Sequence, residues 1–379
     1  MMLKIKPFYL KLCSLFLLPF FQQFLLAVPL LLRKKININY DQDRIKIQII
    51  LFLLILYLFV YDIIFKQLNY HSLLTLTPFF FLLFSSFLKI NTVFLSKIRR
   101  CVYIIFFLDF SANILSVFLN LDIYGEPVFY FKSAYHSLKG IFGHPYISVA
   151  LGAITFLYAS LFKDKRMMCL SLLGLFLSSS LRSLLLLFPI LVSSYILSKA
   201  YRFLFIPLVL ILGMVLILQF VKLDSNGALI DHCKLNIHNN SYYDCKSLNS
   251  SALRSYAWTS FAKAFPQIYL TGYGHREARV AFQEFSYDKV DRDKIFESPY
   301  FQYTFDYGIP FSILLVSLFL LWMHNSYNNY FKSNRNTFKK RLHATKLAIS
   351  SLFFFDSFYG TFFFSIVSYT TLQFILFLE

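Results

Sequence analysis

A single carboxylate stands at the point where a long polar segment gives way to an apolar one. The stretch FESPYFQYTFDYG, residues 296–308, contains Glu297. Ser298 and Pro299 are predicted to be the N-cap and first position of a helix, since Ser accepts a hydrogen bond from a free N–H and Pro has no N–H to leave unpaired. The dipole of such a helix favours an ionised Glu297. The carboxylate is either a general base or an ordinary solvated residue before the helix.

A second carboxylate follows in the same stretch. Asp306 comes nine residues after Glu297, which is about 180° around a continuous helix. We therefore expect Asp306 to face away from Glu297, and the two are not predicted to form an acid/base pair.

A lone arginine is embedded in an apolar stretch. Arg182, in LGLFLSSSLRSLLLLFPILV, is the only Lys or Arg between Arg166 and Lys199. A guanidinium at membrane depth costs about 2.5–3.5 kcal/mol even on the mildest scale, so it needs a partner or water. One interpretation is an internal salt bridge, and three embedded carboxylates are candidate partners: Asp62, Asp109 and Asp356. The other is a clamp for a lipid diphosphate, because Arg presents a planar fork to phosphate oxygens.

Further cations and histidines lie in polar segments. Arg254 lies in LRSYAWTSFAKAF, whose apolar residues recur at helical spacing and predict an amphipathic helix against the membrane. Arg276 and Arg279 follow the turn signal GYGH. Each arginine is either a solvated surface charge or one of several cations that an acidic lipid-linked substrate requires. His144 and His275 are either bases, sugar contacts or surface hydrogen-bonding residues.

Two cysteines lie in the same long polar segment. Cys233 and Cys245 either form a disulfide or are two unpaired thiols. The nearby His232 and His238 do not complete a recognised zinc spacing, so no metal site is predicted. The other cysteines lie in apolar runs and are expected to be small packing residues: Cys13, Cys101 and Cys169.

The elements that must position these residues are membrane helices. The chain has 379 residues, 58% of them hydrophobic, with a mean hydropathy of +0.59, which is too apolar for a soluble protein of this size. The fold class predicted is all-α and polytopic, because the apolar runs are long enough to span a bilayer. We expect eleven spans, or twelve if the first is broken, near residues 8–32, 46–65, 72–88, 101–120, 145–162, 167–181, 183–198, 203–221, 299–322, 344–359 and 361–378.

The charge distribution predicts the topology. The net charge is +18, but the basic residues gather in short loops that fall on one side of the membrane if the spans alternate. Residues 223–298 are nearly balanced in charge. By the positive-inside rule this segment is a large periplasmic loop and the basic segment 323–343 is cytoplasmic. The basicity thus reports topology, and no nucleic-acid partner is expected. The loop divides the chain into an N-terminal bundle, 1–222, and a C-terminal bundle, 299–379.

Four stretches, in order along the chain from about residue 100 to 325, resemble the O-antigen polymerase and ligase superfamily of bacterial envelope glycan enzymes. GIFGHPYISVALGAITFLYA is similar to the family's G-x-F-x-x-P entry into a span, and SSSLRSLLLLF to its serine-rich turn with an embedded arginine. RSYAWTSFAKAFPQIYLTGYG resembles an R-x-x-x-W stretch followed by a G-x-G turn. ESPYFQYTFDYGI resembles the family's entry into the next span.

The resemblance implies a GT-C-like membrane glycosyltransferase in the bacterial inner membrane, with its active site facing the periplasm. Such enzymes act on sugar chains carried by a polyprenyl diphosphate and use no cofactor, metal or nucleotide sugar. By the same resemblance, Arg182 and Arg254 hold the donor diphosphate and Glu297 accepts the proton of the acceptor hydroxyl. Membrane lipid, a chain-length regulator and a flippase are the further partners considered.

Two alternatives stay open. The ligase branch has His where this chain has Glu297, which favours a polymerase that joins lipid-linked repeat units. A ligase that transfers the glycan to lipid A-core is the runner-up. A polysaccharide flippase or transporter is the alternative from another class, although such proteins usually carry short loops on both faces and buried charges along a central path.

Overall fold

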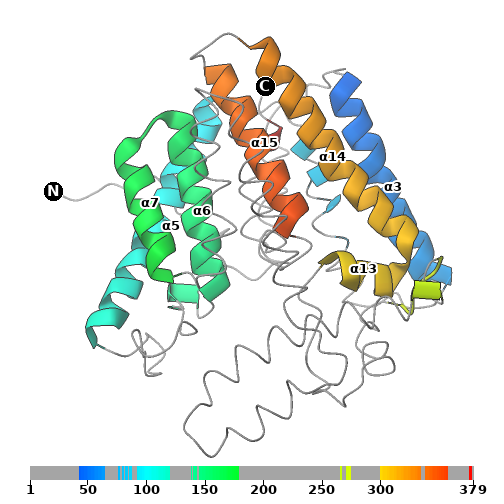
Figure 1. Cartoon of the computed structure of the whole chain (residues 1–379), viewed down its shortest axis with the longest axis horizontal. Coiled ribbons are helices and arrows are strands. Elements are labelled where there is room, and N and C mark those ends of the chain that lie inside the picture. The colour runs from blue at the N-terminus through cyan, green and yellow to red at the C-terminus, as the bar shows by residue number, and fades with distance from the viewer. Residues whose placement is uncertain are drawn as a thin grey trace, which may run out of the picture.

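The chain is helical wherever its structure is described. The computed structural model describes residues 42–64, 76, 79–80, 82–83, 85–87, 92–119, 138, 140–142, 145–178, 265–266, 270–274, 299–333, 338–356 and 375–377. Among these residues there are helices and turns and no strand, which confirms the all-α class (Figure 1). The number of spans along the whole chain stays a prediction.

The helices follow the apolar runs of the sequence. They are α3 Gln42–Ile64, α5 Thr92–Leu119, the 3-10 turn η1 Gly140–Phe142, α6 Pro145–Phe162, α7 Lys165–Ser178, α13 Pro299–Tyr307, α14 Ile309–Lys332 and α15 Phe338–Asp356. Helix α6 has the predicted bounds, and α13 begins at Pro299 as predicted. Helix α7 begins after Asp164, whose carboxylate accepts a hydrogen bond from Met167 N at 3.3 Å and so caps the new helix.

Three helices among the described residues are long and apolar enough to cross a membrane: Asp43–Ile64, Thr92–Leu119 and Ile309–Lys332. The first has 22 residues, which rise about 33 Å against a hydrocarbon core of about 30 Å. Their outward faces are apolar as well, with Phe52 56%, Leu108 53% and Ile313 58% exposed. A helix that is apolar on all sides suits a lipid environment.

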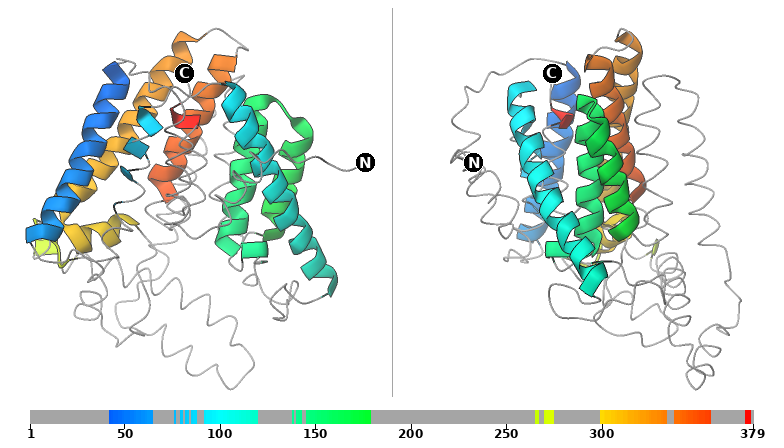
Figure 2. Two further views of the ribbon diagram at one scale, coloured as in Figure 1. Left: turned by 180° about the vertical axis from the view of Figure 1, so that it is seen from behind. Right: turned by 90° about the vertical axis from the view of Figure 1, so that its left-hand side faces the viewer.

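The helices pack as one bundle in which α14 and α6 are central. Helix α14 packs against α3 and α15, and α6 packs against α5, α7 and α15 (Figures 1 and 2). Phe319 of α14 stacks on Phe353 of α15 with ring centroids 5.7 Å apart. Cys101 is buried in this core as predicted, whereas Cys169 is exposed on α7. The N-terminal and C-terminal helices therefore share one core.

The predicted span 299–322 is wrong as a single helix. It is broken at Gly308, which separates the short α13 from α14 and has φ +84°, a conformation that residues other than glycine rarely adopt. Pro310 follows in the first turn of α14, where its missing N–H costs no hydrogen bond. In Figure 1, α13 lies across the end of α14 and does not continue it.

The predicted spans 299–322 and 344–359 leave the segment 323–343 between them, and most of that segment is helical. Helix α14 continues to Lys332 and α15 begins at Phe338. The polar residues HNSYNNY extend α14 because some of them pack inward: Asn325, Ser326 and Tyr330 are buried. Composition alone does not show which of these polar residues are buried, so the predicted span ends at residue 322, before the helix does.

Cations gather at one end of the bundle. Every Lys and Arg of the described residues lies in the first three turns of α3, α5 or α15, between α6 and α7, in the first turn of α7, or in the last turn of α14. These segments meet at the upper end in Figure 1. Arg341 Nε donates to the carbonyl of Leu161 at 3.1 Å, and the Arg99 guanidinium lies 4.3 Å from the ring centroid of Phe162. We call this the basic end.

Buried carboxylates lie toward the opposite end, which we call the aspartate end. Asp62 is near the end of α3, Asp109 is in the second half of α5 and Asp306 is near the end of α13; each is at most 2% exposed. The same end carries η1 and the turn 270–274 (Figure 1). The described part of the bundle thus has two chemically different ends.

Candidate functional site at the aspartate end

The predicted site residues lie outside the described residues, but the segments beside three of them are described. These predicted residues are Glu297, Arg182, Arg254, Arg276, Arg279, His144, His275, Cys233 and Cys245. Glu297 comes two residues before Pro299 of α13, and His275 directly follows the turn 270–274. His144 stands between η1 and α6. All of these flanking segments are at the aspartate end, so the candidate site is built from their described residues.

The turn 270–274 is docked on the junction between α13 and α14. Tyr273 N donates to the carbonyl of Phe305 at 2.7 Å, and Gly274 N donates to that of Asp306 at 2.9 Å. A Cβ at Gly272 would lie 2.7 Å from the Asp306 carbonyl oxygen, and one at Gly308 would overlap the carbonyl of Leu270. The two backbones therefore approach as closely as glycine permits, and they connect two stretches that are far apart in the sequence.

Helix α3 supports the other side of this junction. The hydroxyl of Tyr57 donates to the carbonyl of Tyr307 at 2.6 Å, which is one of the carbonyls left without an intrahelical partner where α13 ends. Tyr61 packs edge-on against the Tyr307 ring with centroids 5.2 Å apart. Tyr303 packs edge-on against Phe311 at 5.3 Å. An aromatic cluster from three helices thus fixes the angle between α13 and α14.

Two carboxylates are packed into this aromatic cluster. Asp62 and Asp306 are each 1% exposed, and both lie close enough to Tyr61 to act on it electrostatically. Because they are buried, neither is open to a bulky substrate in this geometry. Tyrosines with an apolar face and a polar hydroxyl can line a binding surface for a hydroxyl-rich ligand. The aromatic cluster therefore holds the α13–α14 junction in place. Its two buried carboxylates are not accessible as a base.

Asp109 organises a second part of this end. Its Oδ1 accepts hydrogen bonds from Ile141 N at 3.0 Å and Ser148 Oγ at 3.1 Å. Its Oδ2 accepts one from Asn113 Nδ2 at 3.4 Å. A Cβ at Gly140 would overlap the Asp109 carboxylate, so the 3-10 turn can approach only because residue 140 is glycine. Asp109 thereby holds the turn that leads into His144.

The hydrogen bonds of Asp109 give it a role that the sequence did not indicate, and its pairing with Arg182 stays a prediction because Arg182 lies outside the described residues. Asp109 was a candidate salt-bridge partner of Arg182, but among the described residues its carboxylate is held by hydrogen bonds and contacts no cation. A polar stripe on α5 signals this role, because Asp109, Asn113 and Ser116 recur at helical spacing and are all buried. Asp62 stays a candidate partner, and for Asp356 only its place at the end of α15 is described.

Comparison of the chain with protein-family models, with curated proteins and with solved structures gives no match.

Proposed function

We propose that this chain is a membrane-embedded, GT-C-like glycosyltransferase of the O-antigen polymerase type. It joins oligosaccharide repeat units carried on polyprenyl diphosphate, at the periplasmic face of the bacterial inner membrane. The observation that carries the proposal is the docking of the turn 270–274 on the α13–α14 junction through Tyr273 N and Gly274 N. It joins two of the four stretches that resemble that enzyme family, one inside the long polar segment 223–298 and one at its C-terminal end.

The separation of charge supports the orientation. Cations resist translocation, so the basic end faces the cytoplasm and the aspartate end faces the periplasm. The segments beside Glu297, His275 and His144 are then on the outer side, where lipid-linked repeat units are joined. The buried aspartates of the described residues gather at one end and do not follow a path through the bundle, which favours an enzyme over a transporter.

The chemistry assigned to the residues is a displacement at the donor sugar. Glu297 accepts the proton of the acceptor hydroxyl, and the hydroxyl oxygen forms a bond to the anomeric carbon of the donor. The bond from that carbon to the diphosphate oxygen breaks, and polyprenyl diphosphate leaves. Arg182 and Arg254 offset the charge that develops on the leaving diphosphate. Arg276, Arg279, His144 and His275 are the further substrate contacts proposed.

The test is substitution of the base. Glu297→Gln keeps size and hydrogen bonding but cannot accept a proton, so we expect turnover to fall about 10²–10⁴-fold with little change in donor binding. Glycan length is read on gels at matched protein level, with Glu284→Gln from the same polar segment as the control. Wild-type glycan ladders from Glu297→Gln would contradict the assignment.

A reconstituted assay separates the alternatives. Purified protein in liposomes receives polyprenyl-linked repeat units, with and without lipid A-core. Growth in chain length without lipid A-core supports a polymerase. Transfer only to lipid A-core identifies a ligase, and movement of the substrate between leaflets without bond formation identifies a flippase.

A further inference from the structure

A cavity lies at the basic end, far from the proposed catalytic face. It has a volume of about 80 Å³, is open on one side and is lined by residues of α3, α14, α15 and the C-terminal residues 375–377. Its lining residues are Asp43, Arg44, Ile47, Trp322, Asn325, Ser326, Asn329, His343, Lys346, Leu376 and Phe377. Arg44 is 7% exposed and donates to the carbonyl of Phe377 at 2.7 Å, which ties the C-terminal residues to α3 and closes one side of the cavity.

Three polar groups in the cavity wall have unused hydrogen-bonding capacity. Trp322 Nε1, Asn325 Nδ2 and His343 Nδ1 are buried and have no hydrogen-bond partner among the described residues. Trp322 is 3% and Asn325 9% exposed. An indole N–H and an amide NH₂ can only donate, and a buried donor without a partner costs about 1–3 kcal/mol. A native fold rarely leaves several such groups around one cavity unless something binds there.

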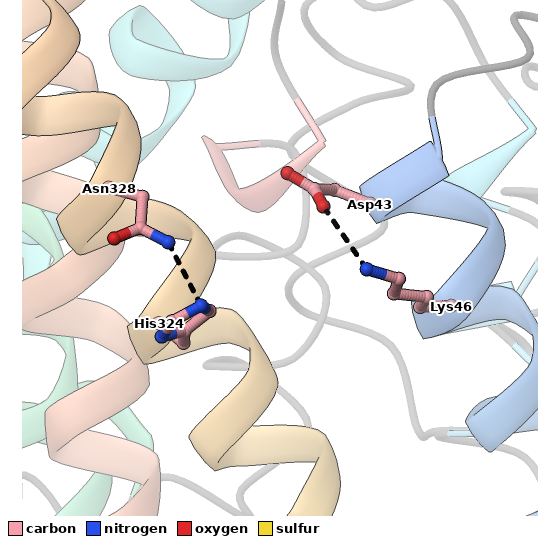
Figure 3. Close-up of polar contacts among 4 residues, drawn as sticks. All are labelled: Asp43, Lys46, His324 and Asn328. Atoms are coloured by element: carbon pink, nitrogen blue, oxygen red, sulfur yellow. Dashed lines mark hydrogen bonds and ion pairs between the residues drawn. The ribbon is translucent and has the colours of Figure 1, made fainter.

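The charges around the cavity favour an anion. Among the described residues its lining contains two cations, Arg44 and Lys346, and the single carboxylate of Asp43. Asp43 forms an exposed ion pair with Lys46 at 3.9 Å (Figure 3). Burial, together with the charges of Lys346 and Lys339, lowers the pKa of His343 to about 4. The imidazole is therefore neutral at pH 7, and in the tautomer with the proton on Nδ1 it adds a third donor.

We propose that this cavity binds a phosphate ester, whose oxygens accept hydrogen bonds from Trp322, Asn325 and His343 beside the cations of the basic end. Phosphate offers several strong acceptor oxygens in a small volume, which matches convergent donors and positive charge. A phospholipid headgroup and a free phosphate share this chemistry. The apolar lining residues Ile47 and Leu376 suit a lipid, and anionic lipids are attracted to basic surfaces on the cytoplasmic side. The inference does not depend on the glycosyltransferase proposal.

The test measures ligand-dependent thermal stability of the full chain in detergent. Dioctanoyl phosphatidylglycerol, dioctanoyl glycerol and inorganic phosphate are titrated separately, because a ligand that binds only the folded state raises Tm by mass action. We expect a saturable rise with the phospholipid and none with dioctanoyl glycerol, which has the same chains without phosphate. A rise in Tm with inorganic phosphate as well shows that a soluble phosphate can also be the ligand. Absence of a saturable rise with both phosphate ligands, or an equal rise with dioctanoyl glycerol, overturns the proposal.

Substitution of lining residues tests whether the ligand binds in this cavity. Asn325→Leu and Trp322→Phe remove one donor each, and we expect ligand affinity to fall at least about tenfold, since a hydrogen bond to a charged group is lost. The matched controls are Asn328→Leu and His324→Leu, whose side chains are bonded to each other at 2.9 Å on α14 outside the cavity lining (Figure 3). These controls should keep wild-type affinity.

A second readout separates a binding role from a structural one. Removing a buried donor that has no partner relieves a cost, so Asn325→Leu should leave Tm without ligand unchanged or raised. Unchanged affinity in both cavity variants would overturn the proposal. So would a lower Tm of Asn325→Leu without ligand, because that result would show that the amide already has a structural partner.

Discussion

Two polar groups at the aspartate end and the groups that line the cavity at the basic end differ in their hydrogen bonding. At the aspartate end, polar side chains are hydrogen-bonded to the protein backbone. Asp109 accepts from the N–H of Ile141, and Tyr57 donates to the carbonyl of Tyr307. At the basic end, several polar groups around the cavity have no hydrogen-bond partner among the described residues. Cations there lie over aromatic rings: the Lys340 ammonium lies 4.6 Å from the ring centroid of Tyr330.

The difference indicates separate tasks. Buried groups that satisfy one another hold backbone segments in fixed positions, as a site for group transfer requires. Unsatisfied donors beside positive charge are ready for a ligand from outside the chain. On the two proposals above, the aspartate end positions backbone segments and the basic end recruits a ligand. The predictions below are ordered from the largest expected effect to the smallest.

We expect the two ends of the bundle to lie on opposite sides of the membrane, so thiol labelling of each end in intact cells should be all-or-none. In a background with the five native cysteines replaced by alanine, Leu270→Cys should react with an impermeant thiol reagent in intact cells. Lys46→Cys should react only after permeabilisation, because the positive-inside rule predicts that the basic end faces the cytoplasm. Lys46 belongs to an exposed ion pair, so its replacement costs little stability. The reverse labelling pattern would invert the proposed orientation.

The glycine at the α13–α14 junction should be the most sensitive structural position of the aspartate end. Gly308→Val places a β-branched residue at φ +84° and a Cβ against the carbonyl of Leu270. We expect a loss of several kcal/mol, since left-handed backbone alone costs about 1–2 kcal/mol without glycine. Thermal unfolding in detergent measures it. Ser333→Val, just beyond the other end of α14, is the control and should retain most of the stability.

Asp109 is expected to stabilise the fold mainly through the hydrogen bonds that its Oδ1 accepts. Asp109→Ala leaves Ile141 N without its acceptor and should cost about 1–3 kcal/mol. Asp109→Asn keeps an oxygen at the Oδ1 position and should cost less. Thermal unfolding of both variants measures the difference. Equal losses would show that the negative charge matters more than the hydrogen bonds to η1.

The smallest expected effect is at Tyr57. Tyr57→Phe keeps the ring but removes the hydrogen bond to the carbonyl of Tyr307, and a single hydrogen bond contributes about 0.5–1.5 kcal/mol. Tyr327→Phe, at an exposed residue near the basic end, is the control and should be neutral. If both variants unfold at the wild-type temperature, the bond does not stabilise the junction.

Local signals were enough to predict several helices. The bounds of α6 coincide with an apolar run, and α13 begins at Pro299 after Ser298, as capping preferences predict. The clustering of cations was also predictable, because helices that alternate in direction bring the basic loops to one side. The roles of Glu297 and the arginines stay predictions, since those residues lie outside the described part of the chain.

The break at Gly308 was not predictable from the apolar pattern. The apolar residues on both sides of it predict one span, although Gly308 and Pro310 are local signals for a break. The break is stabilised by a turn more than thirty residues earlier, through the bonds from Tyr273 N and Gly274 N. Contacts between residues so distant in the sequence leave no periodic signal at either site.

By itself, the sequence of this protein determined what depends on neighbouring residues: apolar length, helix starts and the side on which cations gather. Only the tertiary structure decided which polar groups meet. Asp109 and Ser148 come from different helices, as do Asn325 and His343, and neither pairing follows from spacing along one chain segment. The physical reason is that the cost of burying a polar group depends on the partners that packing brings to it.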